Sequence, residues 1–249
     1  MVAEPCARRP AAPGPRFPDR AAYAAPVSDP SAQANPRDAA REKAVRIREF
    51  RQMVRERHPP FLAAVLADAR LTSRNRGRPL QEASRYRVAL EALRLAWESD
   101  GFLAQTLYRA KASLQRRGIP VLPRLLHRLA IATSGIYIGD PVVVHPGVHL
   151  AHGQIVIDGI VEVHAGVQIF PFVTIGLRAG NMVGPTIGPR ATVGSGAKVL
   201  GDVEVGERAK VGANAVVLAD VPAGTTVVGV PARAARRTVG TDSAAEIGD

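Results

Sequence analysis

Aliphatic residues recur at every sixth position through the second half of the chain. A period of six matches neither the α-helix, which repeats about every 3.6 residues, nor the alternation of an ordinary strand. It predicts short flat strands joined by corners, three to a triangular coil, with the aliphatic side chains pointing into a narrow prism. The positions are Ile138, Val144, Leu150, Ile157, Val163, Ile169, Ile175, Ile187, Val193, Val199, Val205, Val211 and Val217.

A small or β-branched residue lies four places after most of these aliphatics, where the chain would turn tightly above the coil below it. These residues are Val148, Val161, Val167, Val173, Ala191, Ala197, Val203, Ala209 and Ala215. Two irregularities interrupt the repeat. A one-residue slip at AHGQ (151–154) predicts a bulged corner. A double interval at GLRAGNMVGPT (176–186) is either an irregular pair of sextets or a protruding loop, and its Gly, Asn and Pro content favours the loop.

The first half of the chain has helical patterns instead. Helices are predicted within residues 38–58, 61–71, 80–100, 102–118 and 122–135, because these segments are rich in good helix formers. A Pro or Gly is expected to end the helices, as at the Asp100-Gly101 pair. The apolar residues of 80–100 recur at three- and four-residue spacing and predict a core-facing stripe. That stripe is Leu80, Ala83, Tyr86, Ala89, Leu90, Leu93 and Trp97.

These patterns divide the chain into four segments. Residues 1–38 are rich in Ala, Pro and Arg, have no period, and are expected to be a disordered leader that holds Cys6. Residues 39–135 are the α-helical domain, 136–230 the β-helix, and 231–249 a C-terminal tail. The fold class expected is mainly β, a parallel β-helix preceded by an α-helical domain.

Composition narrows the class of protein. The 249 residues include one cysteine, which excludes an internal disulfide framework, and no apolar run approaches the roughly 20 residues of a membrane span. Glu4, Arg8 and Arg9 stand where a secretory signal would be apolar. We therefore expect a soluble, intracellular protein.

The basic surplus is confined to the first half. Residues 1–137 carry 25 basic and 12 acidic side chains, whereas 138–249 carry 8 and 10, within a net charge of +11. This surplus is compatible with nucleic-acid binding or with a solvated helical surface. Because the arginines are scattered and aromatics make up only 4% of the chain, the solvated surface is favoured.

Several motifs resemble a known family. The sextets, GSGAKVLGDVEVGERAKVGANAVVLADVP (194–222) and VVGVPAR (227–233) resemble the left-handed β-helix acyltransferases with hexapeptide repeats. Within them, the helical domain, HRLAIATSGIYIGDPVVVHPGV (127–148) and the position of AHG resemble the serine O-acetyltransferases. The resemblance covers about residues 100–235. It implies a left-handed coil, acetyl-CoA as co-substrate without a metal, and a cytoplasmic enzyme of cysteine biosynthesis. It also implies a homotrimer or a dimer of trimers, with the site between subunits and no nucleic-acid or membrane partner.

Acetyl transfer to a hydroxyl needs a base, and imidazole suits that role because its pKa lies near neutral pH. His152 at the slip aligns with the catalytic histidine of the family. The family's other acceptor residues are missing: its orienting aspartate aligns with Tyr137, its substrate aspartate with Ala151, and its second histidine with Gly184. Asp158 or Glu162 would orient His152 or bind an ammonium group instead. Arg178 in the long interval would hold a substrate carboxylate.

The donor-binding residues are also inferred from the resemblance. Ser195 and Ala213 lie eighteen positions apart, hence on successive coils, and match positions that contact coenzyme A. Arg233 matches an arginine near the nucleotide phosphates, and Gly176 matches a glycine near the thioester. The alternative for the small residues is that tight coils need Ala and Gly anyway.

His145 and His164 each follow an inward aliphatic and fall one coil apart on the same face. They are interpreted as a stacked surface or interface pair, with a metal site between subunits, as in the carbonic anhydrases of this fold, as the alternative.

Three functions remain open for the whole chain. The first is transfer of acetyl to serine, the second is transfer to a sugar or polysaccharide hydroxyl, and the third is an inactive scaffold. The helical domain favours the first, the missing acceptor residues favour the second, and the presence of His152 at an irregular corner opposes the third.

Overall fold

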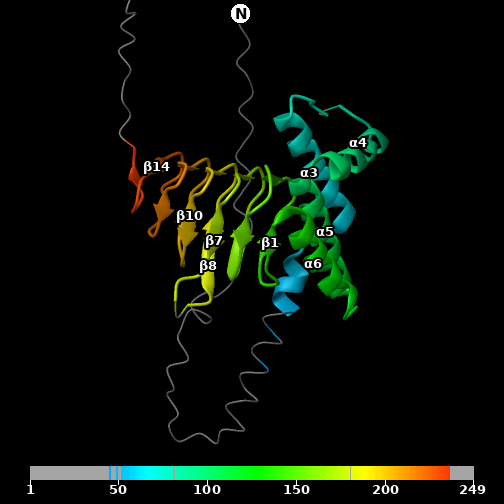
Figure 1. Ribbon diagram of the computed structural model, residues 1–249, viewed down its shortest axis with the longest axis horizontal. Coiled ribbons are helices and arrows are strands. Elements are labelled where there is room, and N and C mark those ends of the chain that lie inside the picture. The colour runs from blue at the N-terminus through cyan, green and yellow to red at the C-terminus, as the bar shows by residue number, and fades with distance from the viewer. Residues whose placement is uncertain (1–44, 46–48, 50–51, 81, 180, 236–249) are drawn as a thin grey trace, which may run out of the picture.

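The computed structural model describes residues 45, 49, 52–80, 82–179 and 181–235. Helices pack against one end of a stack of flat triangular coils, and the chain then runs coil by coil toward the opposite end (Figure 1). The predicted leader, with Cys6, and the tail beyond residue 235 lie outside the described residues. No helix of the part described combines the length and apolarity needed to cross a bilayer.

Four helices follow the predicted segments. They are α3 (Phe61–Asn75), α4 (Arg85–Glu98), α5 (Asp100–Arg116) and α6 (Leu122–Ser134). Residues 52–57 are helical as well and end before the Pro59-Pro60 pair. Helix α6 ends at Gly135, which adopts the left-handed conformation at φ 67° as a helix-ending glycine does. The existence of the predicted helices is thereby confirmed over the described residues.

The predicted core face of α4 is wrong. Its buried residues are Val88, Ala92 and Leu95, which pack in one cluster with residues of α3 and α5. Within the single chain, Leu93 is 71% exposed and Trp97 is 93% exposed. Helix α4 has apolar residues on two faces, and the smaller side chains of the second face are the ones that fit against α3 and α5.

The expected stop at Asp100-Gly101 is also wrong. Helix α4 ends at Glu98, and the Ser99 side chain caps the next helix by accepting the backbone N–H of Phe102. Gly101 lies within the first turn of α5, where an added Cβ would come 2.3 Å from the carbonyl oxygen of Leu150. This glycine therefore permits close packing of α5 on the β-helix.

The β-helix has three faces of parallel strands, as predicted. Face A is β1-β4-β7-β10-β13, face B is β2-β5-β8-β11, and face C is β3-β6-β9-β12-β14, with β15 antiparallel at its end. The strands are β1 Tyr137–Ile138, β2 Val143–Val144, β3 His149–Leu150, β4 Val156–Ile157, β5 Ile160–Val163, β6 Gln168–Ile169, β7 Thr174–Gly176, β8 Val183–Ile187, β9 Thr192–Val193, β10 Lys198–Leu200, β11 Glu204–Val205, β12 Lys210–Val211, β13 Val216–Val217, β14 Thr226–Val228 and β15 Arg233–Ala234. The expected left-handed parallel β-helix after an α-helical domain is confirmed.

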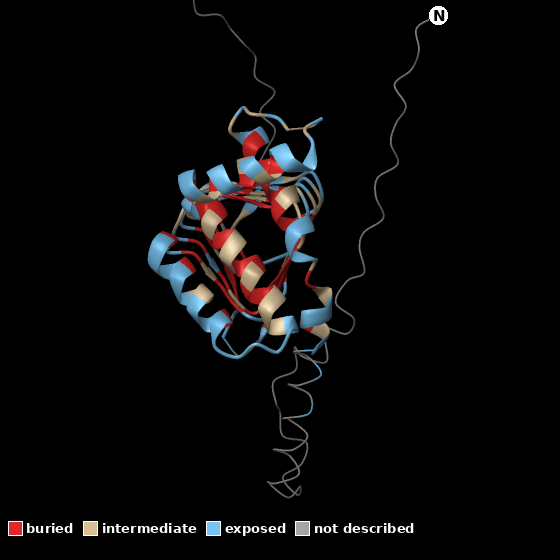
Figure 2. Ribbon diagram, turned by 90° about the vertical axis from the view of Figure 1, so that its right-hand side faces the viewer, coloured by how far each residue is buried: buried red, intermediate tan, exposed pale blue. Residues whose placement is uncertain are grey.

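The six-residue register forms the core of the prism. All thirteen aliphatics of the register are at most 4% exposed, and the small residues four places later are buried with them. Figure 2 shows buried residues on the inner side of the coils and exposed residues on the outer side of the helices. A prism filled by Val, Ile, Leu and Ala leaves no room for rings, which explains the low aromatic content.

The two irregular segments behave differently. Gln154 in the AHGQ corner has a positive φ of 62°, as a tight corner requires. In the long interval, the described residues that leave the coil are 177–179 and 181–182, because Val183–Ile187 form strand β8 and pair with β5. The loop prediction is therefore too long, since Gly184 and Pro185 belong to a strand.

The helical domain covers the open end of the β-helix. The first coil has no coil before it, so several of its carbonyl groups would lack strand partners. Side chains of α5 supply donors instead: Gln105 to Val148 at 3.1 Å, Tyr108 to Val142 at 2.7 Å, and Lys111 to Ile138 at 2.8 Å. This explains why long polar side chains of α5 are buried at the junction.

Candidate active site

The three corners of each coil stack into three edges of the prism. The first edge, between faces C and A, holds residues 151–155, 170–173, 194–197 and 212–215. The second, between A and B, holds 139–142, 158–159, 177–179, 181–182 and 201–203, and the third, between B and C, holds 145–148, 164–167, 188–191 and 206–209. We call them the His152 edge, the Asp158 edge and the His145 edge.

His152 is exposed at the AHGQ corner, close to the helical domain. The corner is held in place by Ser134 at the end of α6, whose carbonyl accepts the backbone N–H of Gln154 at 3.1 Å. No side chain of the described residues hydrogen-bonds the His152 ring. The imidazole therefore faces solvent on a fixed corner, open to a substrate or to a neighbouring subunit.

His149 lies just before this corner and is buried. Its Nδ1 is 3.2 Å from the Thr72 hydroxyl of α3. Burial is the main cause that lowers its pKa to about 4, and the positive charges of Arg76 and His152 add to this effect. His149 is therefore a neutral residue that ties strand β3 to α3.

The predicted donor residues Ser195 and Ala213 lie on the His152 edge. The carbonyl of Ser195 accepts the N–H of Asn214 at 2.8 Å, and the carbonyl of Pro171 accepts that of Gly196 at 2.9 Å, so these corners stack directly. Together with His152, they form one continuous line of corners along the prism. The structure thus brings the base candidate and two donor candidates to one edge.

Gly176 and Arg233 lie elsewhere. Gly176 ends β7 at the start of the Asp158 edge, and an added Cβ would meet only the Asp158 carbonyl oxygen, at 3.7 Å. Arg233 belongs to β15, exposed at the C-terminal end of face C. Neither lies beside His152 within one chain.

The Asp158 edge joins Asp158 and Arg178. Asp158 follows β4, so this strand separates it from His152. Burial is the main cause that lowers the pKa of Lys111 and raises the pKa of Tyr137, and the negative charge of Asp158 acts upward on both. Arg178 is exposed, and its side chain lies over Gly201, where an added Cβ would come within 2.5 Å of Cδ. The structure therefore does not bring either residue to His152 in the same chain.

Glu162 lies on face B and has other partners. Arg57 donates from Nη2 to Oε1 at 2.6 Å, and His145 Nε2 lies 2.7 Å from the same oxygen. Burial alone would raise the pKa of this carboxyl, but the hydrogen bond from His145 and the charge of Arg57 overcome it, so the pKa is lowered. The expectation that Glu162 stands beside His152 is not met within the chain.

Arg57 was not found by the sequence analysis. It precedes Glu162 by 105 positions, in a helix whose arginines all look alike in sequence. Only the packing of residues 52–57 against face B selects it, through Val54 in a cluster with Val143 and Ile160.

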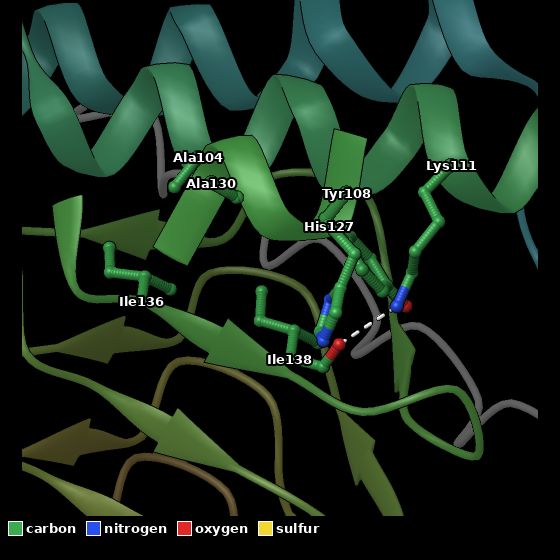
Figure 3. A pocket seen from close by; sticks show the side chains of 7 residues that line it. All are labelled: Ala104, Tyr108, Lys111, His127, Ala130, Ile136 and Ile138. Atoms are coloured by element: carbon green, nitrogen blue, oxygen red, sulfur yellow. Dashed lines mark hydrogen bonds between the residues drawn. The ribbon is translucent and has the colours of Figure 1, made fainter. Parts of the chain in front are cut away.

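A small hollow lies at the junction of α5, α6 and β1 (Figure 3). His127 of α6 stands edge-on to the Tyr137 ring at 5.0 Å, and burial is the main cause of its lowered pKa. Lys111 reaches across to Ile138 and Asp140. The hollow is lined largely by apolar side chains, and Tyr108 and Lys111 already donate to carbonyl groups of the coil, so we interpret it as a packing junction.

The family profile described as Bacterial transferase hexapeptide (six repeats) matches residues 184–219. No curated protein sequence matches the chain. The matched segment spans strands β8 to β13, where the sextets are most regular.

Many solved structures match the chain, and several of them are serine acetyltransferases that cover about three quarters of it. A soybean serine acetyltransferase apoenzyme is 31% identical, with a TM-score of 0.58 over 71% of this chain and 69% of its own. A serine acetyltransferase from Neisseria gonorrhoeae, in complex with serine, is 27% identical, with a TM-score of 0.58 over 74% and 73%. A serine acetyltransferase in complex with CoA is 27% identical, with a TM-score of 0.60 over 77% of each chain.

Proposed function

The chain belongs to the serine acetyltransferase family of hexapeptide-repeat acyltransferases, and from this we propose that it acetylates the hydroxyl of L-serine from acetyl-CoA, with His152 as base. As a member of that family, it is an acyltransferase. The observation that carries the proposal is the line of corners shared by His152, Ser195 and Ala213 on one edge. An extended thioester lying along this edge would present its acetyl group to the exposed imidazole.

The proposed reaction has one proton transfer at its centre. The neutral ring of His152 accepts the proton of the acceptor hydroxyl, and the oxygen attacks the thioester carbonyl carbon. The carbon–sulfur bond then breaks, and the protonated ring of His152 gives its proton to the leaving thiolate, so that the thiol leaves and the imidazole is neutral again. The product of serine acetylation is O-acetylserine, a precursor for cysteine biosynthesis in the cytoplasm.

We propose that a complete site is assembled between subunits of a homotrimer. Asp158 and Arg178 share an edge that lies across face A from His152, so one chain does not offer base and charged acceptor groups together. Two prisms packed side by side would bring the His152 edge of one chain to another edge of its neighbour. In that arrangement, Asp158 orients the imidazole or binds the ammonium group, and Arg178 binds the carboxylate. Glu162 remains a second candidate for the ammonium, and Gly176 and Arg233 for the donor.

Helix α4 supports a further association, into a dimer of trimers. Tyr86, Leu90, Leu93 and Trp97 form an exposed apolar stripe, of the kind that marks contact surfaces. We expect Leu93→Arg to halve the mass measured by sedimentation from six chains to three, with Arg94→Ala as control. A wild-type monomer with full activity would contradict the assembly.

An acceptor panel tests the proposed reaction. The protein is incubated with acetyl-CoA and serine, threonine, glycerol or neutral sugars, and the released thiol is followed. We expect serine to be the fastest acceptor, with activity lost in His152→Ala and kept in His127→Ala, which changes a histidine of the helical domain. A neutral sugar acetylated faster than serine would replace serine as the acceptor.

The second candidate, a sugar or polysaccharide O-acetyltransferase, has one specific observation in its favour. Ala151 precedes His152, so the corner carries no carboxylate for an ammonium group. A neutral hydroxyl acceptor needs none, and the same base and donor edge would serve it.

A further inference from the structure

A cluster of two histidines and one glutamate lies on face B and the His145 edge, away from His152. The pairing of β2 with β5 stacks the rings of His145 and His164, with centroids 4.7 Å apart and planes at 8°. The buried Oε1 of Glu162 is 2.7 Å from Nε2 of His145 and 3.9 Å from Nε2 of His164. One ligand atom from each of the three residues lies within 4.8 Å of the other two.

We propose that His145, Glu162 and His164 bind one divalent transition-metal ion of the zinc class. Two imidazole nitrogens and one carboxylate oxygen are a ligand set that such ions prefer, and three protein ligands leave positions for water or an anion. The site is separate from the His152 edge, and a Glu162 carboxylate that holds the ion does not serve a substrate ammonium group, for which Asp158 is then the candidate.

The repeat itself does not require these side chains. One and two coils above His164, the same corner position holds Gly188 and Gly206. The strand partners of Glu162 are Val143 below and Thr186 above. Glycine is therefore enough for the tight corner, and valine is enough for the strand position. Packing alone does not explain why two histidines and a glutamate lie together on two adjacent coils.

The geometry is close to that of a coordinated ion. Ligand atoms at about 2.0–2.2 Å from a tetrahedral zinc ion lie roughly 3.3–3.6 Å from one another, so side-chain rotations that turn the two stacked imidazoles toward the Glu162 oxygen would bring all three ligand atoms into range. The side chains of His145 and His164 are 30% and 14% exposed, which gives an ion a route from solvent. The buried carboxylate then anchors the ion from the prism side.

Arg57 occupies the oxygen that the ion would use. Its Nη2 donates to Oε1 of Glu162 at 2.6 Å, the same atom that faces both imidazoles. The guanidinium group and the metal ion therefore compete for this oxygen. Removing the guanidinium in Arg57→Gln should strengthen metal binding, whereas removing any of the three ligands should weaken it.

The test uses the full chain after dialysis against a chelator. Co²⁺ is titrated and followed by its visible absorption, and Zn²⁺ affinity is measured by competition with a chromophoric chelator. We expect one ion per chain, and at least about a tenfold loss of affinity in His145→Ala, His164→Ala and the isosteric Glu162→Gln. His127→Ala and Cys6→Ser, which remove a histidine and the thiol outside the cluster, should bind as the wild type does.

Several results would overturn the proposal. They are no Co²⁺ binding by the wild type up to about 1 mM, or equal binding by wild type and ligand variants. A weaker site in Arg57→Gln would overturn the assigned competition. X-ray absorption at the zinc edge of the loaded wild type needs no variant, and a spectrum without two imidazoles per zinc would also reject the site.

Discussion

Arg109 of α5 and Asp68 of α3 form a buried ion pair, with Nε of Arg109 3.0 Å from Oδ2 of Asp68 and side chains at most 2% exposed. Oδ1 of Asp68 also accepts the backbone N–H groups of Gly147 at 2.8 Å and Val148 at 3.1 Å. Arg109 in turn donates to the carbonyl of His145 at 2.8 Å. The pair thus bonds two helices to the first coil of the β-helix.

Breaking this pair from one side should be costly. Arg109→Met leaves the Asp68 carboxylate buried without its cation, and we expect a loss of about 3 kcal/mol in the free energy of unfolding. Urea unfolding followed by circular dichroism measures it. The double variant Asp68→Leu/Arg109→Met should recover part of the loss, and Arg94→Ala, at an exposed ion pair, should leave the midpoint nearly unchanged. An unchanged midpoint in Arg109→Met would contradict the role of the pair.

A charge inside the prism should destabilise the β-helix. Val199 is 0% exposed between Ile175 and Val217 of the neighbouring coils. Val199→Asp buries a carboxyl group without a partner, and we expect a loss of several kcal/mol, measured by thermal and urea unfolding. The control is Lys210→Asp, at an exposed position of β12. Equal stability of the two variants would be inconsistent with an inward Val199.

His152 should carry the proton transfer. His152→Ala should lower turnover by about a hundredfold or more, the usual contribution of a general base, while the binding of acetyl-CoA is kept. Steady-state kinetics and a donor-binding titration measure the two effects separately. If His152→Ala remains near wild-type activity while His145→Ala or His164→Ala is inactive, the base was assigned to the wrong residue.

Two buried histidines should make stability depend on pH. Burial is the main cause that lowers the pKa of His58 and of His149 to about 4 from 6.5. Between these values the unfolded chain binds more protons than the folded one, so this contribution is complete above pH 6.5 and is lost as the pH falls toward 4.

The free energy of unfolding should fall by at most about 1.4 kcal/mol per pH unit for each of these histidines. Urea midpoints measured from pH 7 down to pH 4 should therefore decrease, and the decrease should be smaller in His149→Gln, even if that variant is less stable throughout. His152→Gln, which changes an exposed histidine, is the control. If the pH profile of His149→Gln equals that of the wild type, protonation of His149 does not contribute to the pH dependence of stability.

The β-helix was predictable from sequence because a six-residue period of aliphatic residues fits neither an α-helix nor an ordinary strand. Every inward position of that period is buried, from Ile138 to Val217. The buried face of α4 was not predictable from sequence, because the helix carries two apolar stripes. Only packing against α3 and α5 selects Val88, Ala92 and Leu95. Sequence spacing likewise cannot reveal that Arg57 meets Glu162 across 105 positions.

The candidate site was predictable in part for a related reason. The sextet period fixes which corners stack, so it correctly placed Ser195 and Ala213 on successive coils. It also places Asp158 and Arg178 on another edge from His152, although Asp158 follows His152 by only six positions in sequence. Six residues along a flat strand lead to the next corner, and nearness in sequence is then misleading.

The acceptor is tested most directly at Arg178. Serine carries an ammonium and a carboxylate group beside its hydroxyl, and a selective pocket must pair both, because an unpaired charge in a dry site is costly. Arg178 is exposed on the Asp158 edge, and in the proposed trimer its guanidinium would pair with the carboxylate of a serine held between two chains. We expect Arg178→Ala to raise the KM for serine about tenfold or more while the KM for acetyl-CoA stays nearly unchanged.

The control is Arg190→Ala, which removes an exposed arginine of the His145 edge that pairs with Glu207. A neutral sugar has no carboxylate, so its acetylation would be almost insensitive to Arg178→Ala. If that variant is silent with serine, and a neutral sugar is acetylated faster than serine, the enzyme is a sugar O-acetyltransferase.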